Sequence, residues 1–385
     1  MPSELSNASP STEAAPDRAQ RFARALLEEA GLGLDAQHPW DMRLHSPDAI
    51  RRALAQGNLG LGESYMDGEW DCEELDEFFA RLLRSGVVDR VSPVALLFHA
   101  LQAHLLNRQT ARRAWAVGER HYDLGNDFYA DMLDPRMTYT CGYWKDASNL
   151  AEAQEAKLDL VCRKLDLRPG MRVLDIGCGW GSFMAFAAKR YGVQCVGVTI
   201  SREQCEWARQ RYAGLPLEFR LQDYRELDER FERIVSIGMF EHVGRKNHRT
   251  FMQTLARCLD DDGLCLLHTI GKNRRRSVPD PWIDKYIFPN GDLPSIGQIG
   301  DALDGLLVVE DLHNFGADYD RTLMAWYANF EAHWPRFAEE LGERFRRMWR
   351  YYLLSCAGAF RARDIQLWQW VMSRRGVPGG YRRVS

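Results

Sequence analysis

The sequence predicts an α/β protein with a seven-stranded Rossmann-like sheet and a smaller, mainly helical domain at its N-terminal end. From residue 151 on, short apolar runs alternate with helical patterns, which is typical of a parallel sheet covered by helices. Before residue 110, apolar residues recur with helical spacing. At 385 residues, the chain is long enough for a main domain and a small companion.

The N-terminal part divides into a tail and a helical domain. Residues 1–18 are rich in Ser, Pro and Ala and lack the apolar core of a signal peptide, so we expect a disordered tail. Residues 19–110 should form the helical domain, which suits either lipid contact or dimerisation. Its helices are predicted at residues 18–31, 73–84 and 93–112, with a glycine- and aromatic-rich segment at 57–71.

Residues 111–385 should form the main domain, in which a helix over 151–165 precedes seven strands. The strands are predicted at residues 171–177, 193–200, 217–223, 231–240, 263–270, 306–315 and 365–373. In an open α/β sheet the ligand lies beyond the carboxyl ends of the strands, so the residues that follow each strand are the site candidates.

Composition excludes several classes of protein. Fifty Lys and Arg residues against 54 Asp and Glu residues give a net charge of −4, which argues against a general nucleic-acid binder. The nine cysteines contain no Cys-x-x-Cys pair, so we predict neither a disulfide framework nor a metal site. No apolar run approaches transmembrane length. We therefore expect a cytoplasmic protein whose membrane contact is peripheral.

The first predicted strand runs into a glycine-rich loop, Val-Leu-Asp-Ile-Gly-Cys-Gly-Trp-Gly at residues 173–181. Glycines at 177, 179 and 181 allow close approach to a ligand and positive φ angles. The Asp-x-Gly-x-Gly-x-Gly spacing resembles motif I of S-adenosylmethionine (SAM) methyltransferases, in which the loop holds an amino acid and a nucleoside. The alternative is a glycine-rich turn in some other doubly wound protein.

The next two strands end in polar residues. Thr199, Ser201 and Gln204 follow the second strand and could bind ribose or methionyl groups, although Ser201 and Gln204 also fit a capping box. Asp223 and Tyr224 follow the third strand, where a carboxylate could accept from an adenine amino group and a ring could stack on its face. A surface turn is the alternative there.

The fourth and fifth strands place Glu241 and His268 at the same edge of the sheet. A Glu/His pair can orient a small proton-accepting species, whereas His242 is expected to be mainly structural. Aromatic residues are dense at 121–129 and 137–144. Such rings usually belong to a core, but here they would cover the cofactor mouth, where their faces can stabilise a sulfonium or a carbocation.

Eight segments, in this order, resemble the cyclopropane-fatty-acyl-phospholipid synthase family. They are residues 121–129, 137–144, 173–183, 199–204, 239–244, 266–271, 314–326 and 356–369. The resemblance covers about residues 116–373, and residues 60–70 extend it into the helical domain.

The resemblance implies that residues 111–385 are a SAM-dependent methyltransferase domain. The enzyme would transfer a methyl group from SAM to a cis double bond of an unsaturated phospholipid acyl chain, and a bound bicarbonate ion would then remove a proton so that the ring closes. The implied bicarbonate site comprises the backbone of Cys141 and Ile270 and the side chains of Glu241, His268 and Tyr319. The implied SAM contacts are Tyr139, Thr140, Leu174, Asp175, Gly177, Cys178, Gly179, Gly181, Thr199, Ser201, Gln204, Asp223 and Tyr224.

Cys356 lies at the family position of an active cysteine. A packing role is favoured, because alkene methylation needs no covalent nucleophile and no base is adjacent in sequence. The basic run at 272–276 could pair with phospholipid phosphates at the inner face of the membrane, and aromatic residues at 281–289 could insert. The alternative is a solvated basic loop with a packed aromatic hinge.

Two other functions remain open at this point. A SAM-dependent enzyme of the same fold could make a methyl-branched lipid or act on a small molecule, and it need not retain the implied bicarbonate residues. A catalytically silent lipid-binding protein would instead have gaps in the motifs. A homodimer formed through the N-terminal helices is also possible.

Overall fold

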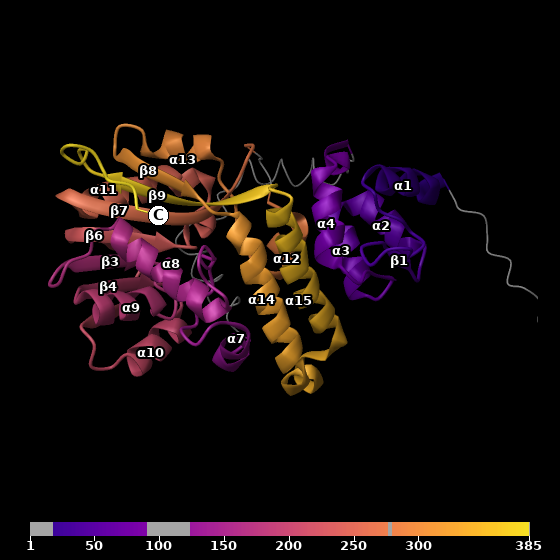
Figure 1. The fold of residues 1–385 in the computed structure, drawn as a ribbon, viewed down its shortest axis with the longest axis horizontal. Coiled ribbons are helices and arrows are strands. Elements are labelled where there is room, and N and C mark those ends of the chain that lie inside the picture. The colour runs from indigo at the N-terminus through magenta and orange to yellow at the C-terminus, as the bar shows by residue number, and fades with distance from the viewer. Residues whose placement is uncertain (1–17, 91–123, 276–278, 385) are drawn as a thin grey trace, which may run out of the picture.

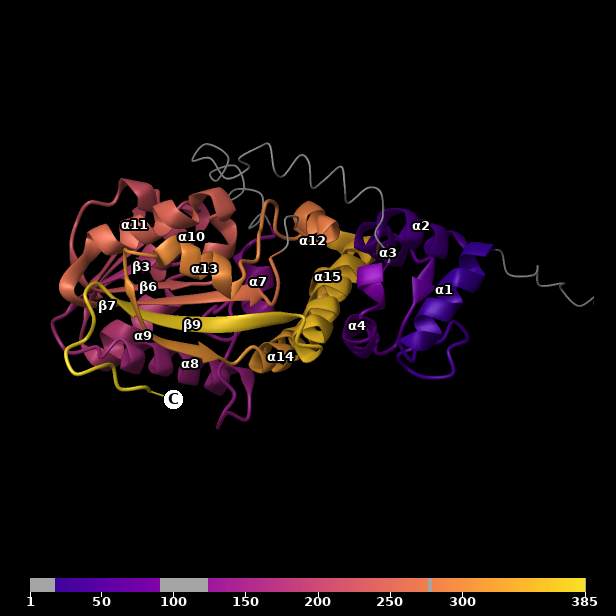
Figure 2. The same cartoon turned by 90° about the horizontal axis from the view of Figure 1, so that it is seen from above.

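The computed structural model describes residues 18–90, 124–275 and 279–384. A group of N-terminal helices lies at one end of the molecule and the sheet with its helices at the other, with the long helices α14 and α15 between them (Figure 1; Figure 2). The tail at 1–17, the predicted helix at 93–112 and the boundary near residue 110 lie outside the described residues.

The predicted seven-stranded sheet is confirmed, with strand order β5-β4-β3-β6-β7-β9-β8. The strands are β3 (Arg172–Ile176), β4 (Gln194–Thr199), β5 (Leu217–Leu221), β6 (Phe231–Ile237), β7 (Leu259–Lys272), β8 (Val308–Asn314) and β9 (Ile365–Ser373). β3 to β7 are parallel, whereas β9 runs antiparallel to both β7 and β8. The first five strands therefore place their carboxyl ends at one edge.

Helices cover both faces of this sheet, and the alternation of side chains along β3 explains why. Leu174 and Ile176 pack with α11 and α13, whereas Val173 packs with α8, α9 and α10 on the opposite face. The helices of this part are α7 (Asn126–Met132), α8 (Leu150–Lys164), α9 (Ser182–Tyr191), α10 (Arg202–Arg211), α11 (His248–Cys258), α12 (Pro281–Tyr286), α13 (Ile296–Leu303), α14 (Ala317–His333) and α15 (Ala338–Arg361).

The N-terminal group is mainly helical, as predicted. It comprises α1 (Arg18–Glu29), α2 (Asp48–Gln56), α3 (Asn58–Met66), α4 (Leu75–Arg84), the 3-10 helix η1 (Val87–Arg90) and a two-stranded ribbon of β1 (Arg43–Leu44) and β2 (Trp70–Asp71). The predicted helices at 18–31 and 73–84 are confirmed as α1 and α4.

The glycine-rich segment forms the helix α3, which the sequence pattern did not indicate. A Cβ atom on Gly60 would lie 2.0 Å from the carbonyl oxygen of Arg52, and one on Gly62 would lie 2.4 Å from the Trp282 indole ring. The glycines therefore let α3 pack closely against α2 and α12, and this packing offsets their low helix propensity.

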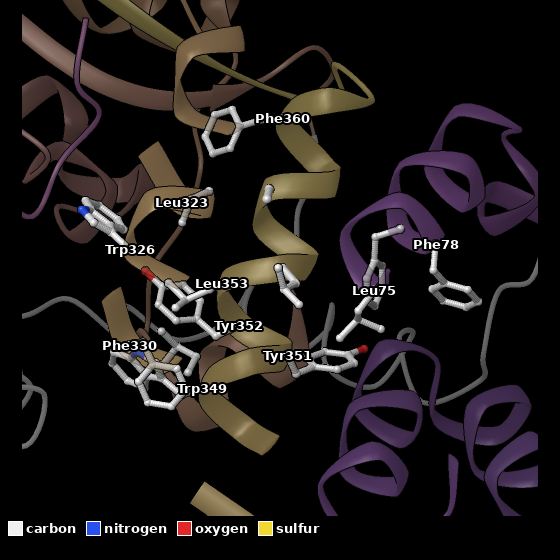
Figure 3. Packing of buried hydrophobic residues seen from close by; sticks show 14 of the residues in the cluster. Leu75, Phe78, Leu323, Trp326, Phe330, Trp349, Tyr351, Tyr352, Leu353 and Phe360 are labelled. Atoms are coloured by element: carbon white, nitrogen blue, oxygen red, sulfur yellow. The ribbon is translucent and has the colours of Figure 1, made fainter. Parts of the chain in front are cut away.

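The N-terminal helices share a hydrophobic core with α15 (Figure 3). Leu75 and Phe78 of α4 and Tyr351 of α15 are each at most 1% exposed. The two helices approach so closely at Gly358 that a Cβ atom there would lie 2.4 Å from the backbone oxygen of Asp76. Burial of these apolar side chains thus fixes the N-terminal helices on the C-terminal helix.

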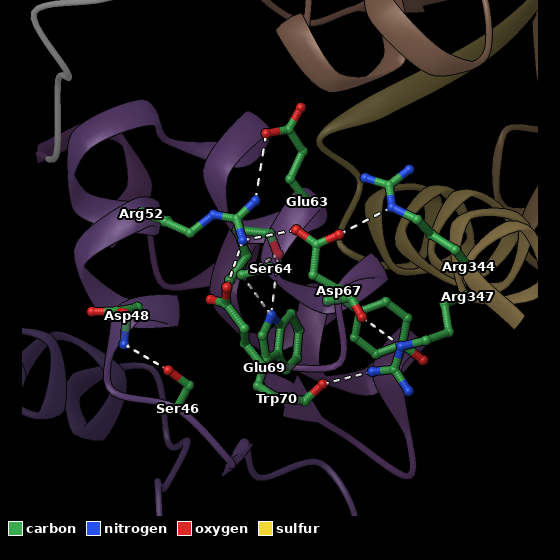
Figure 4. A network of polar contacts seen from close by, with 12 residues as sticks. Ser46, Asp48, Arg52, Glu63, Ser64, Asp67, Glu69, Trp70, Arg344 and Arg347 are labelled. Atoms are coloured by element: carbon green, nitrogen blue, oxygen red, sulfur yellow. Dashed lines mark hydrogen bonds and ion pairs between the residues drawn. The ribbon is translucent and has the colours of Figure 1, made fainter.

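A polar network borders the same contact (Figure 4). Arg52 pairs with Asp67 at 2.9 Å and with Glu69 at 2.6 Å, and Arg344 of α15 pairs with Asp67 at 3.0 Å. Arg347 donates to the backbone oxygen of Trp70 at 2.8 Å. Partly exposed ion pairs contribute at most about 1 kcal/mol each, so the network mainly orients α15 on the N-terminal part.

All nine cysteines are free thiols, eight of them buried, and Cys356 is partly exposed. Within the described ranges, no helix is both long enough and apolar enough to cross a membrane.

Candidate active site

A cavity of about 510 Å³ lies between the carboxyl edge of the sheet and the N-terminal helices. Its apolar wall includes Leu26 and Leu27 of α1, Ile50 of α2, and Phe78 and Phe79 of α4. Its polar wall comes from the loops after β3, β6 and β7 and from α8, α14 and α15. One hollow therefore joins an apolar compartment to the polar edge of the sheet.

The glycine loop has the backbone that its sequence predicts. Gly177, Gly179 and Gly181 have φ angles of 82°, 54° and 81°. A Cβ atom on Gly177 would lie 2.6 Å from Cγ of Met239, so this position excludes a side chain on steric grounds as well. The loop lines the cavity through Asp175, Gly177, Cys178 and Gly179, directly before α9 begins.

Two further groups of predicted SAM contacts reach the cavity wall: Tyr139 with Thr140, and Gln204. Thr140 is held twice by α8, since Gln154 donates to its backbone oxygen at 2.7 Å and Lys157 donates to its hydroxyl at 2.8 Å. The Tyr139 hydroxyl lies 3.0 Å from that of Tyr352 on α15.

The remaining predicted SAM contacts are not among the lining residues. These are Leu174, Gly181, Thr199, Ser201, Asp223 and Tyr224. Ser201 accepts from the backbone N–H of Gln204 at 3.3 Å, so the helix cap weighed from the sequence is present. The Asp223 carboxylate accepts from Arg225 at 2.8 and 2.6 Å, and the Tyr224 ring packs on Phe251. Contact of Asp223 and Tyr224 with adenine stays a prediction.

Glu241 is a buried carboxyl group on the cavity wall, 6% exposed. Its Oε1 accepts from the backbone N–H of Ile270 at 2.7 Å. Its Oε2 has no hydrogen-bond partner among the described residues. Burial raises the pKa of Glu241 to about 7, and the Ile270 N–H counters this only in part. Glu241 can therefore hold or release a proton near neutral pH.

His268 lies on β7, behind the cavity wall and 1% exposed. Its Nδ1 is 3.2 Å from the amide nitrogen of Gln369, and its Nε2 has no partner within the described chain. Burial lowers the pKa of His268 well below its ordinary value, with Lys157 and Lys164 adding to the effect. The ring is therefore neutral, and a Gln369 amide that donates to Nδ1 would leave the proton on Nε2.

Helix α14 brings Tyr319 to the cavity and fixes the segment around Cys141. Tyr319 is 7% exposed, and burial raises the pKa of its hydroxyl well above the ordinary value, so it stays protonated. One turn later, Thr322 accepts from the backbone N–H of Gly142 at 3.0 Å and from the Trp144 indole at 2.9 Å.

Glu241, Ile270 and Tyr319 thus line the cavity, whereas His268 and Cys141 are buried and are not among its lining residues. Cys356 also lines the cavity. Burial raises the pKa of its thiol to about 12, with Asp280 adding to the effect, so a thiolate is disfavoured. This geometry favours the packing role for Cys356.

Sequence reasoning missed the residues that hold this wall in place, namely Gln154, Lys157, Thr322 and Gln369. A signal for two of them exists on α8, where Gln154 and Lys157 lie among the buried Ala153, Leu158 and Val161. Polar side chains on an apolar helix face need buried hydrogen-bond partners. Their presence on this face could therefore have indicated that they bind a neighbouring segment.

The predicted membrane insertion of the aromatic segment is wrong for its central residues. Trp282 is 0% exposed beneath α3, and Ile287 is 1% exposed. The packed aromatic hinge considered as the alternative is what the chain forms. Arg275, from the neighbouring basic run, pairs with Asp301, and residues 276–278 lie outside the described part.

The raised pKa of Glu241 predicts a pH-dependent stability. A carboxyl group that binds its proton more tightly when folded stabilises the fold below its ordinary pKa of 4.5, and that contribution is lost as pH rises through about 7. The difference between the two pKa values corresponds to about 3 kcal/mol of folding free energy. Relative to Glu241→Gln, the wild-type free energy of unfolding should therefore fall between pH 5 and 8 in urea titrations. Parallel pH curves for the two proteins would contradict this prediction.

A parallel sheet that ends in antiparallel strands, with a glycine loop after β3, defines the class: this is the fold of a SAM-dependent methyltransferase. The family profile described as mycolic acid cyclopropane synthetase matches residues 109–370, and the chain belongs to that family. The cyclopropane-fatty-acyl-phospholipid synthase of Escherichia coli (strain K12) is 54% identical over 367 residues, which cover 95% of this chain and 96% of the relative.

Two further comparisons agree with this family. The tuberculostearic acid methyltransferase UfaA1 of Mycobacterium tuberculosis is 35% identical, over 87% of this chain and 83% of the relative. A crystal structure of mycolic acid cyclopropane synthase CmaA1 complexed with SAH and CTAB has a TM-score of 0.63 and 36% identity, covering 68% of this chain and 98% of its own. The expected enzyme class is confirmed, with SAM as the methyl donor.

Proposed function

We propose that this enzyme is a cyclopropane fatty acid synthase that acts on unsaturated phospholipids. It transfers the methyl group of SAM to a cis double bond of an acyl chain, and bicarbonate-assisted loss of a proton closes the ring. The similarity to the E. coli synthase over nearly the whole chain supports this substrate. The apolar compartment formed by α1, α2 and α4 would accommodate the acyl chain.

The observation that carries the bicarbonate proposal is a pair of buried polar atoms without partners. Glu241 Oε2 and His268 Nε2 are both buried and unpaired within the described residues. Buried polar atoms normally have partners, so each of these two atoms would gain one if it contacted a small, polar guest. A neutral imidazole that donates from Nε2, together with a carboxyl group able to carry a proton, suits a bicarbonate anion. Bicarbonate would supply the base that removes the proton.

The residues around this position would protect the cationic reaction. An ionised carboxylate beside a carbocation can trap it as an ester, whereas burial raises the pKa of Glu241 and so favours its protonated form, and its Oε1 already accepts from the Ile270 N–H. The rings of Tyr139 and Tyr319 lie at the cavity. Their faces would stabilise the positive charge. The Tyr319 hydroxyl, which stays protonated, would donate a hydrogen bond to the base.

We propose that the protein is cytoplasmic and that it contacts the inner face of the membrane peripherally. Lys272, the last residue of β7, lines the cavity, and Arg274 and Arg275 lie in the segment that follows it. These cations would attract anionic phospholipid headgroups near the cavity. Because α1, α2 and α4 line the cavity, we favour lipid contact as the role of the N-terminal helices. Assembly into a homodimer remains a separate prediction.

The alternative product is a methyl-branched chain. A relative named tuberculostearic acid methyltransferase is the reason to test for this product. We favour ring closure because Glu241 Oε2 and His268 Nε2, which are buried and have no partner among the described residues, would give a base hydrogen-bonding groups to bind. The two products differ in whether the carbocation loses a proton from the added methyl group.

Methyl-labelled SAM and vesicles of cis-monounsaturated phospholipid test the proposal. We expect NMR and mass spectrometry to show one added methylene per modified chain, with loss of the olefinic protons. A surviving labelled methyl branch would favour the alternative product, and transfer of no label would contradict both enzymatic functions.

A further inference from the structure

Lys157 is a buried cation that lines the cavity together with residues of the glycine loop. No step proposed above uses it. The side chain is 0% exposed, yet it lines the cavity together with Asp175, Gly177 and Gln204. Its ammonium group donates to the Thr140 hydroxyl at 2.8 Å. An ammonium group has three N–H donors, so this bond leaves two donors for other partners at a residue that lines the cavity.

The carboxylates near Lys157 do not neutralise it by direct pairing. Asp134 accepts from the backbone N–H groups of Thr138 at 2.8 Å and Arg136 at 3.2 Å. The Asp175 carboxyl group is also buried, with the residue 3% exposed at the end of β3. The negative charges of Asp134 and Asp175 nevertheless act on Lys157 and raise its pKa, against the larger effect of burial. Burial lowers the pKa of Lys157 to about 8 and raises that of Asp175 to about 7, and the mutual attraction of the two charges offsets burial only in part.

The cavity wall therefore presents an under-compensated ammonium group and an under-compensated carboxylate at the glycine loop. The complementary ligand group is a zwitterion, with one anionic and one cationic end. The amino-acid end of SAM has this charge pattern, since it carries an α-carboxylate and an α-ammonium group. Charge-assisted hydrogen bonds in a site of low dielectric are the strong ones, so the match would contribute substantially to binding.

We propose that Lys157 is a cofactor-binding residue that recognises the α-carboxylate of SAM, while Asp175 faces the α-ammonium group. The Thr140 hydroxyl holds the Lys157 side chain in place, and this bond couples the predicted cofactor segment at 139–140 to helix α8. The inference rests on SAM occupying this cavity, which is part of the proposed function.

The test uses titration calorimetry with two ligands: S-adenosylhomocysteine (SAH) and its decarboxylated analogue, which lacks only the α-carboxylate. Wild-type enzyme should bind SAH more tightly, by about 10- to 100-fold. Lys157→Met should lose that preference by weakening SAH binding while leaving the affinity for the analogue within about 2-fold. Lys157→Gln, which can still donate to Thr140, should behave in the same way and serves if Lys157→Met does not fold.

Lys164→Met is the matched control, because Lys164 is also 0% exposed on α8 but lies outside the cavity, 3.0 Å from Nδ1 of His313. It should keep the wild-type preference for SAH. The assignment would be overturned if the wild type bound both ligands with equal affinity. It would also be overturned if Lys157→Gln weakened the binding of both ligands equally. A wild type that prefers SAH but does not modify phospholipid vesicles would instead refute the proposed function alone.

Discussion

Glu241→Gln should lower kcat by about 100-fold or more, with the dissociation constant for SAH changed by less than about 2-fold. The amide keeps the shape of the side chain and can accept from the Ile270 N–H, as Oε1 does at 2.7 Å. It cannot take up a proton at the cavity-facing position, which the carboxyl group can do because burial raises the pKa of Glu241 to about 7. Steady-state kinetics on phospholipid vesicles and calorimetry with SAH measure the two quantities.

Glu226→Gln provides the matched control. Glu226 is exposed in the 3-10 helix after β5, away from the cavity wall, so the same change of group should leave both kcat and SAH affinity unaltered. Full activity of Glu241→Gln, or an equal loss of turnover and SAH affinity, would contradict the role of Glu241 in handling the proton.

Trp282→Ala should destabilise the protein by about 3–5 kcal/mol, the loss expected when a large buried ring is removed. Trp282 is 0% exposed, its ring packs on Tyr351 at 4.6 Å, and it fills the space that Gly62 leaves open. Equilibrium unfolding in urea, with the transition followed by circular dichroism, measures the effect. Trp282→Phe should lower the free energy of unfolding by less, because most of the contact made by the ring remains.

Trp282→Ala also distinguishes a structural role of Trp282 from a role in membrane binding. If Trp282 inserted into a bilayer, its removal would weaken co-sedimentation with vesicles and leave the unfolding midpoint unchanged. Phe22→Ala is the control for an exposed aromatic residue, since Phe22 is 52% exposed, and it should cost less than about 0.5 kcal/mol.

The fold was largely predictable because its signals are local. The seven apolar runs lie within a few residues of the observed strands, and the positive φ angles at Gly177, Gly179 and Gly181 follow from a loop that must approach a ligand. Segment 57–71 was harder to interpret, because its glycines serve contacts with Arg52 and Trp282. The first contact is made by the neighbouring helix and the second comes from far along the chain, so neither could be inferred from glycine content.

The candidate site was predictable only in part, for a similar reason. Glu241 and His268 could be placed at one edge because parallel strands align their carboxyl ends. Lys157, Thr322 and Gln369 act through side-chain contacts between distant segments, such as the bond from Lys157 to Thr140. Trp282 was misassigned because an aromatic side chain beside arginines has the same sequence pattern at a membrane surface as in a buried hinge.

The distribution of cysteines gives the chain a built-in reporter. Eight thiols are buried in the protein interior, and only Cys356 is partly exposed, because it faces the cavity. Because burial raises the pKa of the Cys356 thiol to about 12, labelling would need alkaline pH, and Cys178, which also lines the cavity, would be replaced first so that the probe modifies one position. A fluorophore or spin label there would lie on the wall of the proposed acyl compartment, so its signal would register the filling and emptying of that compartment during turnover.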